Sequence, residues 1–266
     1  LLCQGMPKAQ VRKKVGEIAE ILGITDILKK PVGGLSGGDR QRVALGRAIV
    51  RDPKAFFMDE PLGALDAEFR EHMSEELRNL HDRMNATTVY VTHDQLEAMQ
   101  MGDKIVVMNH GSVEQFGVPQ EIYDWPATKF VAQFIGSPCM NFLDFKGKVA
   151  GGQASVQLDD VVLNMPELLD GASGDLTFGV RPEHVHLDDA APYRGKVVAT
   201  EYLGTTQIIT LDTPNGQIKA REASLKNVAV GEQIGLRFDA RTVTIFDAST
   251  GRALRSHANQ GVLSHG

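Results

Sequence analysis

One short segment of the first half carries residue types that can bind phosphate through the backbone. Ser36, Gly37 and Gly38 stand at the start of an amphipathic run that predicts a helix over residues 38–50. Glycines lack a Cβ and let backbone N–H groups approach an anion, the serine adds a hydroxyl, and a helix N-terminus attracts negative charge. Taken alone, the segment also fits an ordinary helix cap, with Ser36 as the capping residue.

Three further side chains could hold a metal ion or move a proton. Asp59 and Glu60 end an apolar run that predicts a strand at residues 55–58, and His93 follows a second predicted strand. Open α/β sheets bind ligands at the carboxyl ends of their strands. There, one carboxylate suits Mg²⁺ held through water, and the next can orient or deprotonate an attacking water. Singly, the carboxylates also fit a solvated turn and the histidine a structural role.

The elements that must position these side chains alternate between helix and strand. Apolar spacing predicts further helices over residues 11–22, from about 67 with Asp66 as N-cap, and over 94–101, and β-branched runs predict strands at 87–91 and 104–108. In the helix over 94–101, we expect Leu96, Met99 and Met101 to face the core. Continuous apolar strands between helices indicate a parallel sheet covered on both faces.

The second half has a different pattern. After about residue 136, helical periodicity gives way to short strands between turn signals, including a hairpin turn at residues 213–216. Strands at this spacing favour a small barrel or sandwich. We therefore expect one domain over residues 1–136, a β domain over 137–252 and a flexible polar tail over 253–266.

Composition narrows the classes of function. The 266 residues carry a net charge of −6, and neither half contains a basic nucleic-acid arm or a polybasic membrane anchor. No apolar run approaches the roughly 20 residues that a membrane-spanning helix needs. Cys3 and Cys139 have no motif spacing, which is typical of proteins in a reducing cytosol.

Taken in order, four segments resemble the nucleotide-binding domain of ABC transporters. LSGGD at residues 35–39 is similar to the signature motif, and FFMDE at 56–60 to the Walker B strand with its catalytic glutamate. GALD at 63–66 is similar to the D-loop, and His93 to the switch histidine. Because the four segments occur in this order and at this spacing, we favour the resemblance over the helix cap, the solvated turn and the structural histidine that each segment would fit alone.

Two segments of the second half indicate which class of ABC ATPase the chain resembles. FIGSPCMNFL at residues 134–143 and GVRPEHV at 179–185 are similar to the regulatory domain of ATPases that drive carbohydrate importers of the maltose and glycerol-phosphate type. The resemblance implies the C-terminal part of an α/β P-loop ATPase domain, with a parallel sheet and a helical subdomain. A small all-β barrel of the oligonucleotide-fold type would follow and hold two ATPase subunits together.

The resemblance also implies a role for each site residue. Toward the subunit's own ATP, Asp59 holds Mg²⁺, Glu60 polarises the attacking water, and His93 stabilises the γ-phosphate. Toward the ATP of a second ATPase subunit, the γ-phosphate is contacted by Ser36, Gly37 and Gly38, and Asp66 links the two sites. The implied partners are that second subunit, the transmembrane permease subunits and, indirectly, a periplasmic solute-binding protein, at the cytoplasmic face of the inner membrane and without nucleic acid.

The sequence departs from the family pattern in two places. Asp39 stands where the signature motif usually has glutamine, and a carboxylate repels a triphosphate. No G-x-x-x-x-G-K-[ST] phosphate loop occurs in the 266 residues. We therefore expect a C-terminal fragment that lacks roughly the first hundred residues of its domain and is inactive alone.

Two other functions stay open at this point. A DNA-maintenance ATPase shares the signature and Walker B motifs but needs long coiled-coil arms, and only a short stretch separates Gln41 from Met58. A module with only regulatory or binding function would use the second half alone, which leaves the signature motif without a purpose.

Overall fold

The computed structural model describes residues 5–51, 54–63, 65, 67–83 and 86–263. The chain divides into two compact units, residues 1–102 and 103–266. No helix within the described ranges is long and apolar enough to cross a membrane.

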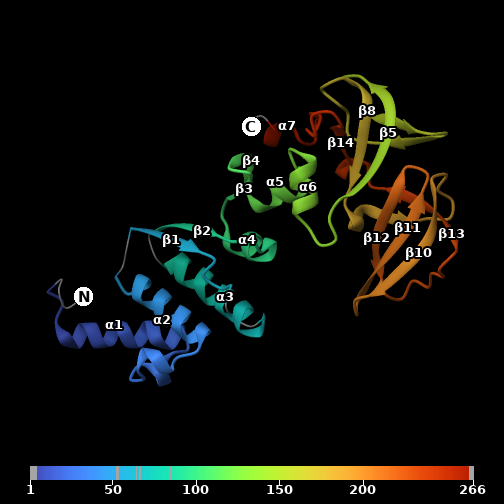
Figure 1. Ribbon diagram of the computed structural model, residues 1–266. Coiled ribbons are helices and arrows are strands. Elements are labelled where there is room, and N and C mark those ends of the chain that lie inside the picture. The colour runs from blue at the N-terminus through green and yellow to red at the C-terminus, as the bar shows by residue number, and fades with distance from the viewer. Residues whose placement is uncertain (1–4, 52–53, 64, 66, 84–85, 264–266) are drawn as a thin grey trace. The chain divides into compact units, whose positions relative to one another are not determined.

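The first unit combines helices with a parallel strand pair (Figure 1). Its elements are α1 (Lys8–Ile21), the 3-10 turns η2 (Thr25–Ile27) and η3 (Val32–Gly34), α2 (Gly37–Ile49), β1 (Ala55–Asp59), α3 (Ala67–Arg83), β2 (Thr87–Val91) and α4 (Gln95–Met101). β1 and β2 pair in parallel along their whole length, and α3 provides the crossover that a parallel pair requires. The helices and strands predicted for this part of the chain are confirmed, with small shifts at their ends.

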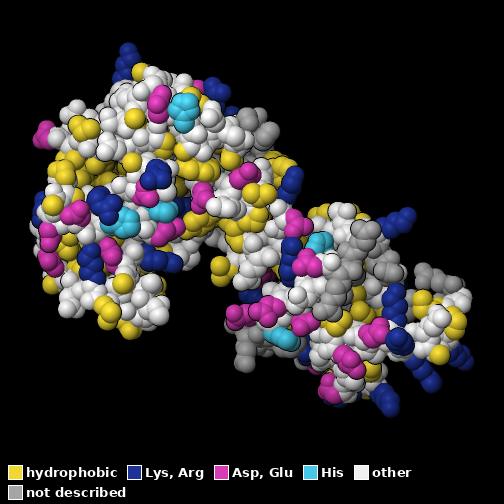
Figure 2. Space-filling model, turned by 180° about the vertical axis from the view of Figure 1, so that it is seen from behind, with side chains coloured by type: hydrophobic (Ala, Val, Ile, Leu, Met, Phe, Trp, Pro, Cys, Tyr) yellow, Lys and Arg dark blue, Asp and Glu magenta, His cyan; other side chains and the backbone are white. Residues whose placement is uncertain are grey.

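The strand pair is covered on one face among the described residues. Phe56 points into a core that it shares with Leu62 and Met73. On the opposite face, Phe57 is 81% exposed, and Val89, its partner across the pair, is exposed as well. The expectation of a sheet covered on both faces is therefore wrong for these residues, because an apolar run does not show what packs against each side of it. Figure 2 shows other exposed hydrophobic side chains between charged ones.

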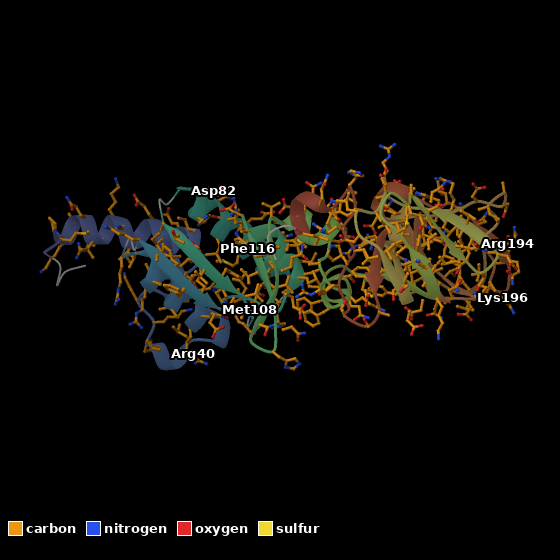
Figure 3. All side chains as sticks on the ribbon, turned by 90° about the horizontal axis from the view of Figure 1, so that it is seen from above. Arg40, Asp82, Met108, Phe116, Arg194 and Lys196 are labelled. Carbon is orange, nitrogen blue, oxygen red and sulfur yellow. The ribbon has the colours of Figure 1, made fainter. Side chains whose placement is uncertain are left out.

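The second unit opens with the hairpin of β3 (Ile105–Asn109) and β4 (Ser112–Gly117), and β3 corresponds to the strand predicted at residues 104–108. His110 and Gly111 at its turn both have positive φ, which is the two-residue turn geometry that matches the twist of the strands. Met108 and Phe116 project from the two strands and are exposed (Figure 3).

The rest of the second unit is mostly antiparallel sheet. Its elements are α5 (Pro119–Asp124), α6 (Lys129–Phe134), β5 (Asn141–Val149), β6 (Ser155–Leu158), β7 (Val161–Asn164), β8 (Ala172–Val180), η4 (Pro182–His184), β9 (Val185–Leu187), β10 (Arg194–Tyr202), β11 (Thr206–Thr213), β12 (Gly216–Ala223), β13 (Gln233–Phe238), η5 (Ala240–Thr242), β14 (Thr244–Asp247) and α7 (Gln260–Leu263). The strand orders are β14–β8–β5, β12–β11–β10–β13–β9 and a separate β6–β7 hairpin. Phe178, Leu211 and Ile245, which come from both larger sheets, belong to one core.

A buried arginine joins α5 and α6 to the β-sheets of this unit. Arg181 follows β8 and is only 1% exposed. Its guanidinium donates to the carbonyl oxygens of Tyr123 (2.7 Å), Ala132 (3.4 Å) and Ile135, at the ends of the two helices. A Cβ on Gly136, whose φ is 109°, would lie 2.8 Å from the same guanidinium, so this close approach requires glycine. The predicted domain boundary after residue 136 stays a prediction.

The segment predicted to be a flexible tail makes specific contacts as far as Leu263. Ala253 forms a bridge with Phe246, and Ser256 forms one with Leu168. The guanidinium of Arg255 lies 2.8 Å from the carboxylate of Asp170. The hydrogen bonds that Arg255 donates lower the pKa of Asp170. Asn259 is buried and hydrogen-bonded on both sides of its amide. Polar composition alone did not reveal these contacts, because each partner is distant in sequence or lies within the segment itself.

Candidate functional site

The glycine-rich segment forms the start of α2. Ser36 is the N-cap: its hydroxyl accepts a hydrogen bond from the backbone N–H of Asp39 at 3.0 Å. Gly37 and Gly38 are the first helical residues. Nothing lies within 4 Å of the place where a Cβ on Gly37 would stand, whereas a Cβ on Gly38 would be 3.2 Å from the side chain of Leu65. Gly37 therefore leaves the helix start open, and Gly38 lets the loop after β1 come close.

Asp39 completes the cap of its own helix. Its carboxylate accepts from the backbone N–H of Ser36 at 3.4 Å and from the guanidinium of Arg42. The hydrogen bonds from Ser36 and Arg42 lower the pKa of Asp39, so the carboxylate stays ionised. The aspartate that replaces the usual glutamine thus forms a capping box within α2, and the positive charge of Arg42 compensates its negative charge.

Glu60 and His93 meet at the ends of the parallel strands. Glu60 follows β1, His93 comes shortly after β2, and Nδ1 of His93 lies 2.9 Å from Oε1 of Glu60. Both side chains are largely exposed. The hydrogen bond that His93 donates to Glu60, and then the negative charge of Glu60, raise the pKa of His93. Two residues far apart in sequence are thereby combined into one acid–base pair that is open to solvent.

Backbone contacts hold Glu60 in an unusual conformation. Its φ of 43° is left-handed, a conformation that residues other than glycine rarely adopt. Its N–H donates to the carbonyl oxygen of Val91 at 2.9 Å, and its own carbonyl accepts from Gly63 at 3.2 Å and from Nε2 of Gln41 at 3.1 Å. Gln41 therefore ties α2 to the end of β1. The sequence motifs did not single out Gln41, because a side-chain contact to a backbone carbonyl leaves no pattern.

The remaining predicted site residues differ in what the structure shows. Asp59 is exposed at the end of β1, opposite Val91. Asp66, predicted as N-cap of α3 and as the link between two sites, lies outside the described residues. Among the described residues, no hydrogen bond or ion pair joins Ser36 to Glu60 or His93.

The donor set fits a magnesium ion carried by a nucleotide. Within the described ranges, no three His, Cys, Asp or Glu side chains gather as a complete metal site. Mg²⁺ commonly keeps several waters and is bound by one or two carboxylates together with phosphate oxygens. The exposed carboxylate of Asp59 is a hard oxygen ligand of this kind, so the residues present fit the ion.

The short helix α4 corrects one expectation. Leu96, predicted to face the core, is 71% exposed, whereas the carboxylate-bearing Glu97 is buried. Met101 packs against the core as expected. In a helix of seven residues the hydrophobic spacing is too short to fix the buried face, and hydrogen bonds to Glu97 decide it instead.

Three family descriptions match the chain. "ABC transporter" matches residues 6–63, "MalK OB fold domain" matches 136–185, and "TOBE domain" matches 178–246. The first covers the glycine-rich segment and Glu60. The other two cover most of the β-rich unit, which agrees with the predicted oligonucleotide-fold-like architecture.

The relatives are import ATPase subunits. The trehalose/maltose import ATP-binding protein MalK of Thermococcus litoralis is 42% identical over 261 residues, 94% of this chain and 70% of that protein. The sn-glycerol-3-phosphate import ATP-binding protein UgpC of a Ruegeria species is 43% identical over 95% of this chain and 71% of its own length. The lactose transport ATP-binding protein LacK of Rhizobium radiobacter is 44% identical over 94% and 72%.

These likenesses agree with the order of the motifs and with the fold of both units. They do not favour the DNA-maintenance alternative, because the relatives carry the names of import and transport subunits. The chain spans about 70% of the length of the Thermococcus protein. It belongs to the nucleotide-binding ATPase subunits of ABC importers.

Proposed function

We propose that this chain belongs to a subunit that hydrolyses ATP to drive import of carbohydrates or related solutes such as glycerol phosphate. The observation that carries the proposal is the contact of Glu60 with His93 at the ends of two adjacent parallel strands. The import names of the relatives supply the class of solute. The transmembrane permease subunits would be its membrane partners, at the cytoplasmic face.

The strand-end residues suit hydrolysis of a phosphoanhydride. Glu60 presents an exposed carboxylate that can orient a water molecule and accept its proton. His93, with its raised pKa, can carry a positive charge toward a developing phosphate charge while it holds Glu60 in place. Asp59 would hold Mg²⁺, which neutralises phosphate charge when it is bound with ATP.

The start of α2 suits the nucleotide of a second ATPase subunit. Its open backbone at Gly37 and its helix dipole favour a phosphate group. The capping box formed by Ser36 and Asp39 keeps that helix end in shape. In this arrangement the start of α2 would serve the nucleotide of the second subunit and the Glu60–His93 pair that of its own, so two subunits together would complete each nucleotide site. A periplasmic solute-binding protein would act on them only through the permease.

The test is a chimera that adds the N-terminal part of the Ruegeria UgpC ahead of this chain. We expect ATP hydrolysis that Glu60→Gln lowers by about 10²–10⁴-fold while ATP binding persists, because the amide keeps the shape and cannot accept the proton. Glu75→Gln, on an exposed position of α3, is the matched control. Hydrolysis at an unchanged rate in the Glu60→Gln chimera would refute the assignment.

A further inference from the structure

A buried carboxylate is linked by hydrogen bonds to the turn that contains the histidine of the candidate site. Glu97 on α4 is 5% exposed and accepts hydrogen bonds from the hydroxyls of Tyr90 (3.0 Å) and Thr92 (2.8 Å). Its other carboxylate oxygen lies 3.8 Å from Nε of Arg70. A charged group is retained in such a place only when hydrogen bonds and an opposite charge compensate its lost hydration.

The Thr92 hydroxyl connects this carboxylate to the backbone around His93. The hydroxyl donates its proton to Glu97, which leaves its oxygen free to accept from the backbone N–H of Asp94 at 2.9 Å. The two residues that flank His93 are therefore held by one oxygen atom, in a turn of the kind that serine and threonine form. Asp94 then caps α4 through the N–H of Leu96 at 2.8 Å.

His93 has little else to fix its position. Its side chain is 77% exposed, and Glu60 is its hydrogen-bond partner among the described residues. An exposed side chain can meet its partner reliably only if its backbone is already in place. The direction of the imidazole therefore depends on the turn at residues 92–94, and the turn depends on the hydroxyl that Glu97 orients.

We propose that Glu97 and Thr92 are positioning residues for His93, holding its backbone so that the imidazole reaches Glu60. The inference rests on the proposed function, in which Glu60 and His93 act together. Glu97 does not touch the reacting atoms; it acts through the Thr92 hydroxyl. Arg70, on α3, compensates the negative charge of Glu97. The guanidinium of Arg70 also lies 3.6 Å from the carboxylate of Asp94.

The protonation states support this direction of the hydrogen bonds. Burial, followed by the nearby charge of Glu97, raises the pKa of Tyr90 far above its usual range. The phenol therefore stays protonated and donates to Glu97. With two hydroxyl donors directed at it, the carboxylate acts as an acceptor, so the Thr92 oxygen keeps its free lone pair toward Asp94.

The test compares the ring ¹⁵N NMR shifts of His93 in variants of the whole 266-residue chain, with the signals assigned by their loss in His93→Asn. In the otherwise unsubstituted chain, Glu60→Gln should shift the His93 ring signals, because it changes the partner of Nδ1. With Thr92→Val, which keeps the shape and removes the hydroxyl, we expect the same Glu60→Gln change to produce no shift. Thr92→Ser keeps the hydroxyl and should restore the response.

Glu97→Met should behave like Thr92→Val, because it removes the oxygen that accepts from the Thr92 hydroxyl, and Glu75→Gln should leave the response intact. If the response to Glu60→Gln persists at full size with Thr92→Val, the positioning role is wrong, and this outcome does not depend on whether Glu97→Met folds. If Glu60→Gln shifts no His93 signal even in the unsubstituted background, the acid–base pair is absent and the proposed function fails with it.

Discussion

At the scale of single residues, the charge of one imidazole sets the pH behaviour of the candidate site. The hydrogen bond that His93 donates to Glu60, and the negative charge of Glu60, raise the pKa of His93 above the ordinary value of about 6.5. We expect Glu60→Gln to lower the titration midpoint of His93, measured by NMR on the purified chain. An unchanged midpoint would show that the two side chains do not interact in solution.

The same interaction makes a small, pH-dependent contribution to folding. Because the folded pKa of His93 is raised, the contribution is complete below the unfolded pKa and is lost as pH rises through the folded value. The difference in unfolding free energy between the unsubstituted chain and Glu60→Gln should therefore shrink with rising pH across that range. Both side chains are largely exposed, so solvent screening keeps the difference small.

How far single residues can be predicted from the sequence depends on the range of the interaction. The cap by Ser36 follows from local chain geometry. The meeting of Glu60 and His93 follows from placing both after strands that turn out to be parallel neighbours. The roles of Gln41 and Glu97 could not be predicted, because they depend on which helix face packs inward and leave no spacing pattern.

At the scale of elements, the hydrogen bonds of Arg181 connect α5 and α6 to the β-rich part of the second unit. Two short helices, α5 and α6, end with carbonyl oxygens directed at its guanidinium, where the helix dipole places partial negative charge. The ring of Tyr123 stacks on the guanidinium, and its hydroxyl donates to Glu183 at 2.6 Å. Burial and that hydrogen bond raise the pKa of Tyr123 to about 12. The family motif at residues 179–185 thus has a packing role as well as a family likeness.

Arg181→Met should destabilise the second unit by about 3 kcal/mol, because it leaves buried carbonyl oxygens without donors. Urea unfolding followed by circular dichroism measures the change. Arg194→Met is the matched control: Arg194 also donates to backbone carbonyls, two in its case, but it is exposed on β10 (Figure 3). We expect an effect below about 1 kcal/mol there, since water replaces the lost donor. Equal effects of the two substitutions would contradict the claim that the buried hydrogen bonds of Arg181 stabilise the second unit.

At the scale of the whole molecule, we expect that the chain does not turn over ATP by itself. No phosphate loop of the form G-x-x-x-x-G-K-[ST] occurs in the 266 residues, and phosphoryl transfer relies on positioning and charge stabilisation around the phosphates. We expect phosphate release by the purified chain at the background rate, both with and without Glu60→Gln. Turnover that Glu60→Gln abolishes would show that the chain completes a site in another way.

The two compact units lead to a last prediction, about where the molecule can be divided. The sequence predicts a boundary after residue 136, where helical periodicity ends, whereas the contacts of Arg181 reach back to Tyr123 and Ala132. A fragment of residues 103–266 keeps these acceptors and the β3–β4 hairpin, and a fragment of residues 137–266 loses both. We expect the longer fragment to unfold at a higher urea concentration, and Arg181→Met to destabilise it far more than it destabilises the shorter one. If the two fragments have the same midpoint, and Arg181→Met affects both equally, then the helices before residue 136 contribute nothing to the β-rich unit, and the boundary belongs where the sequence pattern changes.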